Sequence, residues 1–355
     1  MRFAVIGAGN GGQAIAGYLG LKGYHVNLYD RNVEKVEKIK NKGGIKLEGK
    51  INGFGNVNCI TNDLSVAVTG TDIIMITTIA NAHRELAIQL SPFLQNDQII
   101  ILNPGRTCGA LEFKWALNRA HCNKRLYIAE AQTLIYACRA KEVGIVNIIG
   151  IKDDVLISAL PSIDTDFIIS RIGKVFTCFT PTSNVLRTSL ENIGAIFHPC
   201  VILFNAATIE RGEEFYFYRD ITPNIVSFIE KFDAERIEVG KAYGIDLLSV
   251  NEWISFAYKG IQGNTLCEKM RNNPAYHDIL APSSIYTRQL MEDIPTGVLP
   301  IMELGKAAGL KMTLFESVIN ICCELLNINF RKEGRTLKHL GLENLSIDQI
   351  LNHIQ

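Results

Sequence analysis

The chain has 355 residues, of which 47% are hydrophobic, and its 36 basic residues balance its 36 acidic residues. A zero net charge argues against a nucleic-acid-binding protein and against an acidic disordered chain. A chain of this length can form two domains, each with its own core. No apolar stretch approaches the roughly eighteen residues that a membrane span requires. The first strand begins at once, so we expect no signal peptide, no membrane association and a cytoplasmic protein.

The cysteines support the same location. There are nine of them, an odd number, and no two have the C-x-x-C spacing. Buried free thiols in a reducing compartment explain this pattern better than a disulfide framework or a zinc site. We therefore predict no metal.

The N-terminal segment predicts a strand, a glycine turn and a helix. Residues 3–6 are apolar, and Gly7, Gly9 and Gly12 then fit the pattern G-x-G-x-x-G. In a dinucleotide-binding turn the first glycine allows the tight bend, the second lets backbone approach a pyrophosphate, and the third lets the helix pack on the strand. The alternative is an ordinary strand–turn–helix connection with incidental glycines. The predicted cofactor-binding residues of this turn are Gly7, Ala8, Gly9, Asn10, Gly11 and Gly12.

The second predicted strand supports nucleotide binding. Gly23 is positioned to end the helix, residues 25–29 form the strand, and Asp30 follows it. An acid at this position accepts hydrogen bonds from the ribose 2′-hydroxyl and repels a 2′-phosphate, which favours NAD. Arg31 could stack on adenine or bind that phosphate, so NADP stays open.

Strands and helices alternate up to about residue 175. A charged helix is predicted at 33–42, a glycine-rich hairpin at 45–60, and a buried strand at 72–78 that ends in Thr78, a further cofactor-binding candidate. The later strand candidates are residues 98–102, 125–129, 143–150 and 155–160. This repetition predicts a Rossmann-type, doubly wound, mostly parallel sheet in residues 1–182.

Residues 183–355 have a different pattern. After a polar break at 179–184, helical periodicity dominates, at 189–207, 226–243, 301–308 and 314–326. We predict an α/β domain followed by an all-helical domain, with the substrate in the cleft between them.

Two segments of the helical domain could supply acid–base chemistry and a substrate clamp. His198 precedes Pro199, which should interrupt the helix beside it, and histidine readily exchanges protons near neutral pH. Asp293 could hold the imidazole, and Arg288 could bind a carboxylate through two hydrogen bonds. The alternatives are a core histidine, an Asp293 that caps the next helix, and a solvated surface arginine.

Two loops that follow strands could face a ligand, because ligands bind at the carboxyl ends of parallel strands. One contains Thr133, in the segment that starts at Glu130, and the other contains Gly105, which could let backbone approach a nicotinamide. Ordinary turn chemistry is the alternative for both loops.

Six segments together resemble the opine dehydrogenases of the octopine and nopaline dehydrogenase family. They span nearly the whole chain, and the last four are more specific than the glycine pattern. The segments are GAGNGG at Gly7, LNPGRTCGALEF at Leu102, AEAQTLIYACR at Ala129, SLENIGAIFHP at Ser189, IYTRQLMEDIPTGVLP at Ile285 and GRTLKHLGL at Gly334.

The resemblance implies roles for four residues. His198 and Asp293 correspond to the catalytic dyad of the family, and Arg288 corresponds to the arginine that holds the keto-acid carboxylate. Thr133 corresponds to a threonine that contacts the same carboxylate. Ile135 departs from the family pattern, in which the T-L-P-Y segment carries proline.

The implied activity is the NAD(P)H-dependent reductive condensation of an amino acid with an α-keto acid such as pyruvate. Its partners would be these small molecules, and a homodimer is compatible with the chain. Two other functions stay open. One is a reductase of the glycerol-3-phosphate or ketopantoate type, which needs a lysine as proton donor, and the other is a non-catalytic NAD-binding sensor.

Overall fold

The computed structural model describes all 355 residues, and the chain forms two compact units. Unit 1 contains Met1–Ser189 and Asn352–Gln355, and unit 2 contains Leu190–Leu351. The sequence pattern predicts a division after residue 182, a few residues before the one in the structure. Thr188 and Ser189 belong with the first unit because both hydroxyls donate to the buried Glu130 carboxylate, at 2.6 and 2.7 Å.

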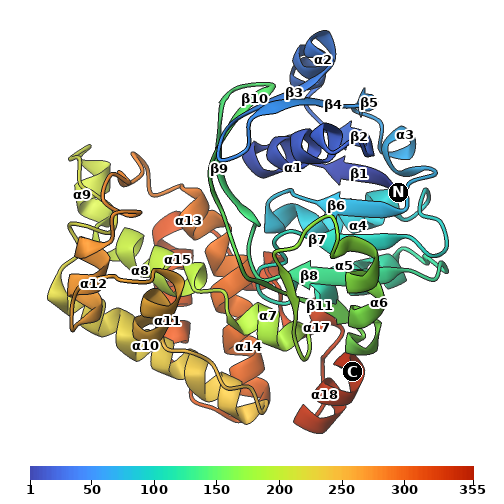
Figure 1. The fold of residues 1–355 in the computed structure, drawn as a ribbon. Helices are drawn as coiled ribbons and strands as arrows, with labels where there is room; N and C mark the ends of the chain where they lie inside the picture. The colour runs from blue at the N-terminus through green and yellow to red at the C-terminus, as the bar shows by residue number, and fades with distance from the viewer. The chain divides into compact units, whose positions relative to one another are not determined.

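Unit 1 is built on an eight-stranded sheet in the order β12-β11-β8-β7-β6-β1-β2-β5 (Figure 1). Neighbouring strands are parallel except β8 and β11, which are antiparallel. The chain passes from β1 to β2 on one side and later returns to β6 on the other side of β1, which creates a topological switch point. The strands are β1 (Arg2–Ile6), β2 (His25–Tyr29), β5 (Cys59–Thr61), β6 (Ile73–Ile76), β7 (Ile99–Leu102), β8 (Tyr127–Ala131), β11 (Val155–Leu160) and β12 (Phe179–Pro181).

A second sheet in unit 1 contains the predicted hairpin. Its order is β4-β3-β10-β9, with strands β3 (Gly44–Gly49), β4 (Gly53–Asn56), β9 (Tyr136–Glu142) and β10 (Ile145–Ile151). Helix α1 (Asn10–Leu21) packs against strands of both sheets. Gly17 and Gly20 make this possible, because a Cβ on Gly20 would lie 2.2 Å from the Asn56 carbonyl oxygen.

The remaining helices of unit 1 follow strands, as the alternating pattern predicts. The charged helix at 33–42 is confirmed, and it ends at Gly43, whose φ of 72° is left-handed. These helices are α2 (Val33–Lys42), α3 (Leu64–Val68), α4 (His83–Leu90), α5 (Gly109–Arg119), α6 (Thr165–Ile172) and α7 (Val185–Leu190), which ends at the unit boundary.

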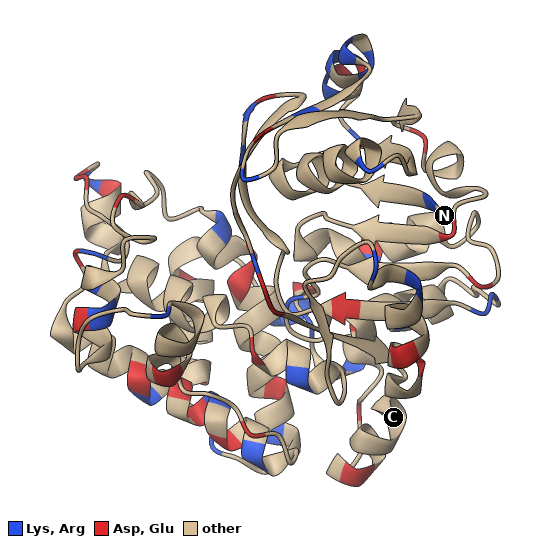
Figure 2. Cartoon of the chain, in the orientation of Figure 1, with Lys and Arg blue, Asp and Glu red and all other residues tan.

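Unit 2 is helical, as predicted. Its elements are α8 (Gly194–Phe204), α9 (Ala206–Glu210), α10 (Pro223–Ala242), α11 (Val250–Ala257), α12 (Leu266–Asn272), α13 (Arg288–Met291), a π-helix (Ile294–Val298), α14 (Leu299–Ala307), α15 (Thr313–Leu326), α16 (Phe330–Glu333) and α17 (Leu337–Leu340). The last helix, α18 (Ile347–Ile354), begins in unit 2, and its residues from Asn352 onward belong to unit 1. None of the helices combines the length and apolar character that crossing a membrane requires. Basic and acidic residues are interspersed along the ribbon of the helices of this unit (Figure 2).

The single helix predicted at 189–207 is divided into the end of α7, then α8 and α9. The fully buried Arg236 explains the first break. Its guanidinium pairs with Asp233 and also donates to the Leu190 carbonyl oxygen at 2.9 Å, so that carbonyl is satisfied outside a continuous helix. The interruption that we expected at Pro199 is wrong, because α8 continues through this residue.

Candidate active site

The glycine turn between β1 and α1 has the tight geometry that nucleotide binding needs. Gly7 has a φ of 105°, and a Cβ on Gly12 would lie only 1.7 Å from the Gly7 carbonyl oxygen. A Cβ on Gly9 would meet nothing within 4 Å. Gly7 and Gly12 are therefore required by the protein itself, whereas Gly9 borders open space that a ligand could use.

Asp30 lies directly beside this turn. The Asp30 side chain is 10% exposed, and its carboxylate accepts hydrogen bonds from the Ala8 N–H at 2.8 Å and from Lys35 Nζ at 3.0 Å. It also accepts from the Asn32 N–H at 2.9 Å, while Arg31 is exposed. The carboxylate is thus held at the end of β2, where a ribose would be bound.

Just after strands β6 and β7 lie hydrogen-bonding groups that have no partner within the protein. The buried Thr78 hydroxyl, whose methyl group would be 3.0 Å from a Cβ on Gly7, has no protein partner. The buried side chain of Asn103, directly after β7, has none for either polar atom. Helix α1 begins without a side-chain cap, so its first N–H groups can bind phosphate. These residues fit a bound dinucleotide.

Two other predicted residues of this region have contacts within the protein. Asn10 Oδ1 accepts from the Ala140 N–H at 3.1 Å, which ties the turn to β9. Gly105 packs so closely on Glu130 that a Cβ there would lie 2.5 Å from the Glu130 Cβ. These contacts within the protein explain why asparagine stands at position 10 and glycine at position 105, whether or not either residue touches a cofactor.

In unit 2 the structure brings together His198 and Asp293, which are 95 positions apart. His198 Nδ1 lies 2.7 Å from Asp293 Oδ2. Since an ionised carboxylate only accepts hydrogen bonds, Nδ1 carries the proton and Nε2 is left for exchange. The Asp293 side chain is 2% exposed and the imidazole is 25% exposed, so a buried acid orients a ring that a ligand can reach.

The two structural alternatives for this pair do not hold. Asp293 makes no side-chain cap hydrogen bond to the helix that follows it, which is a π-helix through Pro295. His198 is not a core histidine, because a quarter of its side chain is exposed. π-helical turns within helices are frequent at functional sites.

Tyr218 is a residue at this site that no sequence pattern predicted. Its hydroxyl lies 3.1 Å from His198 Nε2, the ring nitrogen that does not bond to Asp293. The Tyr218 ring stacks on Tyr276 with centroids 4.1 Å apart, and Phe217 packs edge-on against the imidazole at 5.9 Å. The aromatic run at 215–218 was the available signal, but no spacing rule connects it with His198.

Arg288 lies one helical turn before Glu292 and forms an ion pair with it through Nε. The arginine side chain is 61% exposed, and that of Glu292 is 3% exposed. A buried carboxylate therefore fixes one edge of the guanidinium while much of the side chain remains accessible. Glu292, the residue before Asp293, was not among our candidates.

Thr133 lies after β8 and has an unexpected cationic partner. Lys152 Nζ donates to Thr133 Oγ1 at 2.5 Å. Burial, together with the nearby Arg106 guanidinium, lowers the pKa of Lys152 to about 8. A single lysine in a turn gave no signal in the sequence.

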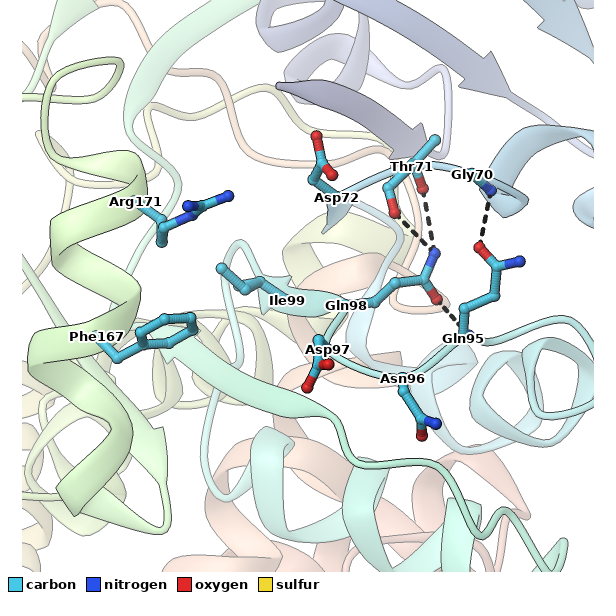
Figure 3. Close-up of a pocket in the computed structure, with 10 residues that line it drawn as sticks. All are labelled: Gly70, Thr71, Asp72, Gln95, Asn96, Asp97, Gln98, Ile99, Phe167 and Arg171. Atoms are coloured by element: carbon cyan, nitrogen blue, oxygen red, sulfur yellow. Dashed lines mark hydrogen bonds between the residues drawn. The ribbon is translucent and has the colours of Figure 1, made fainter.

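A hollow of about 370 Å³ lies elsewhere in unit 1, beside the amino ends of β6 and β7 (Figure 3). Gln98 donates there to the Val68 and Thr71 carbonyl oxygens, and Gln95 accepts from the Gly70 N–H. Ligands of doubly wound sheets bind at the carboxyl ends of the strands, so this hollow is not the cofactor site.

Comparisons with known proteins found matches in both halves of the chain. The family described as NAD/NADP octopine/nopaline dehydrogenase, alpha-helical domain, matches residues 181–326, and that of the NAD-dependent glycerol-3-phosphate dehydrogenase N-terminus matches residues 2–105. An opine dehydrogenase of Arthrobacter sp. (strain 1C) is 37% identical over 355 residues, which cover 99% of this chain and 98% of the relative.

Two solved structures share the fold. Octopine dehydrogenase with NADH and L-arginine has a TM-score of 0.82 at 20% identity, covering 99% of this chain and 98% of its own. Yersinopine dehydrogenase with NADP⁺ bound has a TM-score of 0.78 at 13% identity, covering 100% of this chain and 97% of its own.

Proposed function

The chain belongs to the opine dehydrogenase family and is an NAD(P)-dependent oxidoreductase, and on this premise we propose that it condenses an amino acid with an α-keto acid. The product is a secondary amine that carries two carboxylates. The observation that supports this reaction best is the hydrogen bond between His198 and the buried Asp293. An oriented histidine is the acid–base group that imine formation needs.

In this mechanism the residues of the chain bind and polarise the keto acid. Arg288 and Thr133 hold its carboxylate, which orients the carbonyl group. Imidazolium His198, stabilised by Asp293, donates a hydrogen bond to the carbonyl oxygen and makes the carbon more electrophilic. Attack by the amine then gives a carbinolamine.

His198 also assists the second stage. It takes a proton from the nitrogen of the attacking amine and gives it to the departing hydroxyl, so that water leaves and a protonated imine forms between the two substrates. When bound, reduced NAD(P) supplies the hydride that converts this imine to the secondary amine. Tyr218 lies within hydrogen-bond reach of Nε2 and can keep the imidazole oriented between these steps.

The residues proposed to hold the cofactor are those of the glycine turn, Gly7 to Gly12, with Asp30, Arg31, Thr78 and Gly105. The Asp30 carboxylate at the end of β2 favours NADH over NADPH because it would repel a 2′-phosphate. Lys35 and Arg31 lie beside it, so NADPH can still be used. All nine cysteines are free thiols, so we place the protein in the reducing cytoplasm. A homodimer is a separate part of this proposal.

The test is a panel of amino acids, each with pyruvate, followed by the absorbance of NADH. We expect oxidation of NADH only when both an amine and a keto acid are present. Oxidation with a keto acid alone would instead identify a ketone reductase. Cofactor binding without turnover for any pair would identify a sensor.

A further inference from the structure

Lys152 is a partly exposed lysine held in place at the end of β10. Its backbone N–H donates to the Ile135 carbonyl oxygen at 3.0 Å, and its Nζ donates to Thr133 Oγ1 at 2.5 Å. Both contacts are with the connection between β8 and β9 (Figure 1). The ammonium group is therefore fixed against one loop.

This loop lies next to the nucleotide-binding turn within unit 1. Leu134, the neighbour of Thr133, packs closely on Gly11. A Cβ added to Gly11 would lie 2.8 Å from the Leu134 side chain. Gly105 donates its N–H to the Ala131 carbonyl oxygen at 3.0 Å, which brings the loop after β7 to the end of β8. Thr133 thus lies at the carboxyl end of β8 in the doubly wound sheet, the edge at which ligands of such sheets bind. Lys152, which follows β10 of the second sheet, reaches this edge through its contact with Thr133.

The charges around Lys152 favour an anionic ligand. The Arg106 guanidinium is close enough to repel the ammonium, and Lys152 forms no ion pair with a carboxylate. The adjacent Asp153 and Asp154 are exposed. Burial and the neighbouring guanidinium together lower the Lys152 pKa to about 8, so the charged form is destabilised unless an anion binds.

The hydrogen-bond donors match a carboxylate. An ammonium has three donors, and Thr133 uses one of them. Because the Thr133 oxygen accepts this bond, its own hydroxyl hydrogen is free to point at a ligand. Two N–H donors and one O–H donor can therefore converge on one pair of carboxylate oxygens.

We propose that Lys152 is a substrate-binding residue that, with Thr133, binds the α-carboxylate of the keto acid. The proposal rests on the proposed function, which places a keto acid at Thr133. It adds a cation within unit 1 to the residues that the proposed function assigns to the keto acid.

The test measures the affinity of the protein–NADH complex for pyruvate and, separately, for an amino acid, by calorimetry. We expect Lys152→Met to weaken binding of pyruvate by on the order of tenfold to a hundredfold, the range for a charged hydrogen bond. Thr133→Val should have a smaller effect. The exposed Lys50 provides the matched control, and Lys50→Met should leave both affinities unchanged.

A loss of affinity for the amino acid, with pyruvate affinity unchanged, would overturn the proposal, because the carboxylate bound at Lys152 would then belong to the other substrate. Unchanged affinity for both ligands would overturn the proposal. A fall in kcat with both affinities intact would also overturn it, because Lys152 would then be a proton donor.

The pH dependence gives a second measurement. Pyruvate affinity of the wild type should fall as pH rises through about 8, where the Lys152 ammonium loses its proton. Lys152→Arg should keep the charge and remove this fall, because a guanidinium stays protonated. A fall of the same size in Lys152→Arg would contradict the assignment.

These measurements are separate from turnover. One outcome is that the protein binds pyruvate in a Lys152-dependent way and yet fails to oxidise NADH with every pair of amino acid and keto acid. That result would refute the proposed reaction and retain the site. Turnover with pyruvate binding that Lys152→Met does not change would refute only the site.

Discussion

The nucleotide-binding turn of unit 1 and the histidine site of unit 2 are built by different means. The turn uses consecutive residues, and its geometry depends on the absence of side chains, as at Gly12, where a Cβ would lie 1.7 Å from a carbonyl oxygen. The histidine site uses side chains from separate helices, with His198 on α8 and Asp293 just before the π-helix. Substitutions in the turn should therefore change cofactor affinity and folding, whereas substitutions at the histidine should change turnover.

The largest expected effect is that of His198→Ala. NADH affinity should be unchanged, and kcat should fall by about a hundredfold to ten-thousandfold, the usual contribution of a general acid–base group. The measurements are the Kd for NADH by fluorescence and steady-state turnover. The exposed His25 serves as control, since His25→Ala should change neither. Intact turnover in His198→Ala would refute the proposed acid.

Asp293→Asn should have the next largest effect. It removes the charge behind the hydrogen bond to Nδ1, so the imidazolium is less stable, and kcat should fall about tenfold to a hundredfold. The measurement is the steady-state kcat of the folded variant. An unchanged kcat with normal folding would mean that Asp293 does not act through His198.

A pair of glycine substitutions tests the turn. Gly12→Ala should lower the free energy of unfolding by about 1–3 kcal/mol or more, because the new methyl group overlaps backbone. Gly9→Ala should leave the melting temperature nearly unchanged and weaken NADH binding, because its methyl group would occupy open space beside the turn. Equal losses of stability in the two variants would show that Gly9 also has a packing role.

Asp30→Ala should weaken NADH binding about tenfold, by loss of hydrogen bonds from a charged acceptor, with kcat at saturating cofactor little changed. NADPH should lose less affinity than NADH, because the variant no longer repels a 2′-phosphate. The ratio of the two Kd values checks this. A ratio that does not move would remove Asp30 from cofactor selection.

Tyr218→Phe should have the smallest effect, about twofold to tenfold on kcat, since it removes one hydrogen bond to Nε2 and keeps the stacked ring. Tyr258, which packs edge-on against Tyr276, gives the control. Tyr258→Phe should leave kcat unchanged. A loss of kcat in Tyr258→Phe larger than the loss in Tyr218→Phe would point to the aromatic packing instead of the Tyr218 hydroxyl.

In unit 1 the sequence alone predicts those features whose signals lie close together in the chain. The glycine turn, the strand before it and Asp30 lie within thirty residues, and their spacing follows from one strand–helix–strand unit. The fold class and the hairpin at 45–60 were also confirmed. The pairing of β10 with β3 in a second sheet was not predictable, because no local pattern selects a partner about a hundred residues away.

For unit 2 the sequence identified His198, Asp293 and Arg288 as candidates, but residue types and spacing left each with a structural alternative. The tertiary structure decided that the first two are hydrogen-bonded, that Tyr218 meets Nε2, and that Lys152 meets Thr133 in unit 1. The physical reason is that helix periodicity and turn chemistry act over a few residues. Contacts between side chains far apart in the chain exist only once packing has chosen one arrangement of the helices and strands.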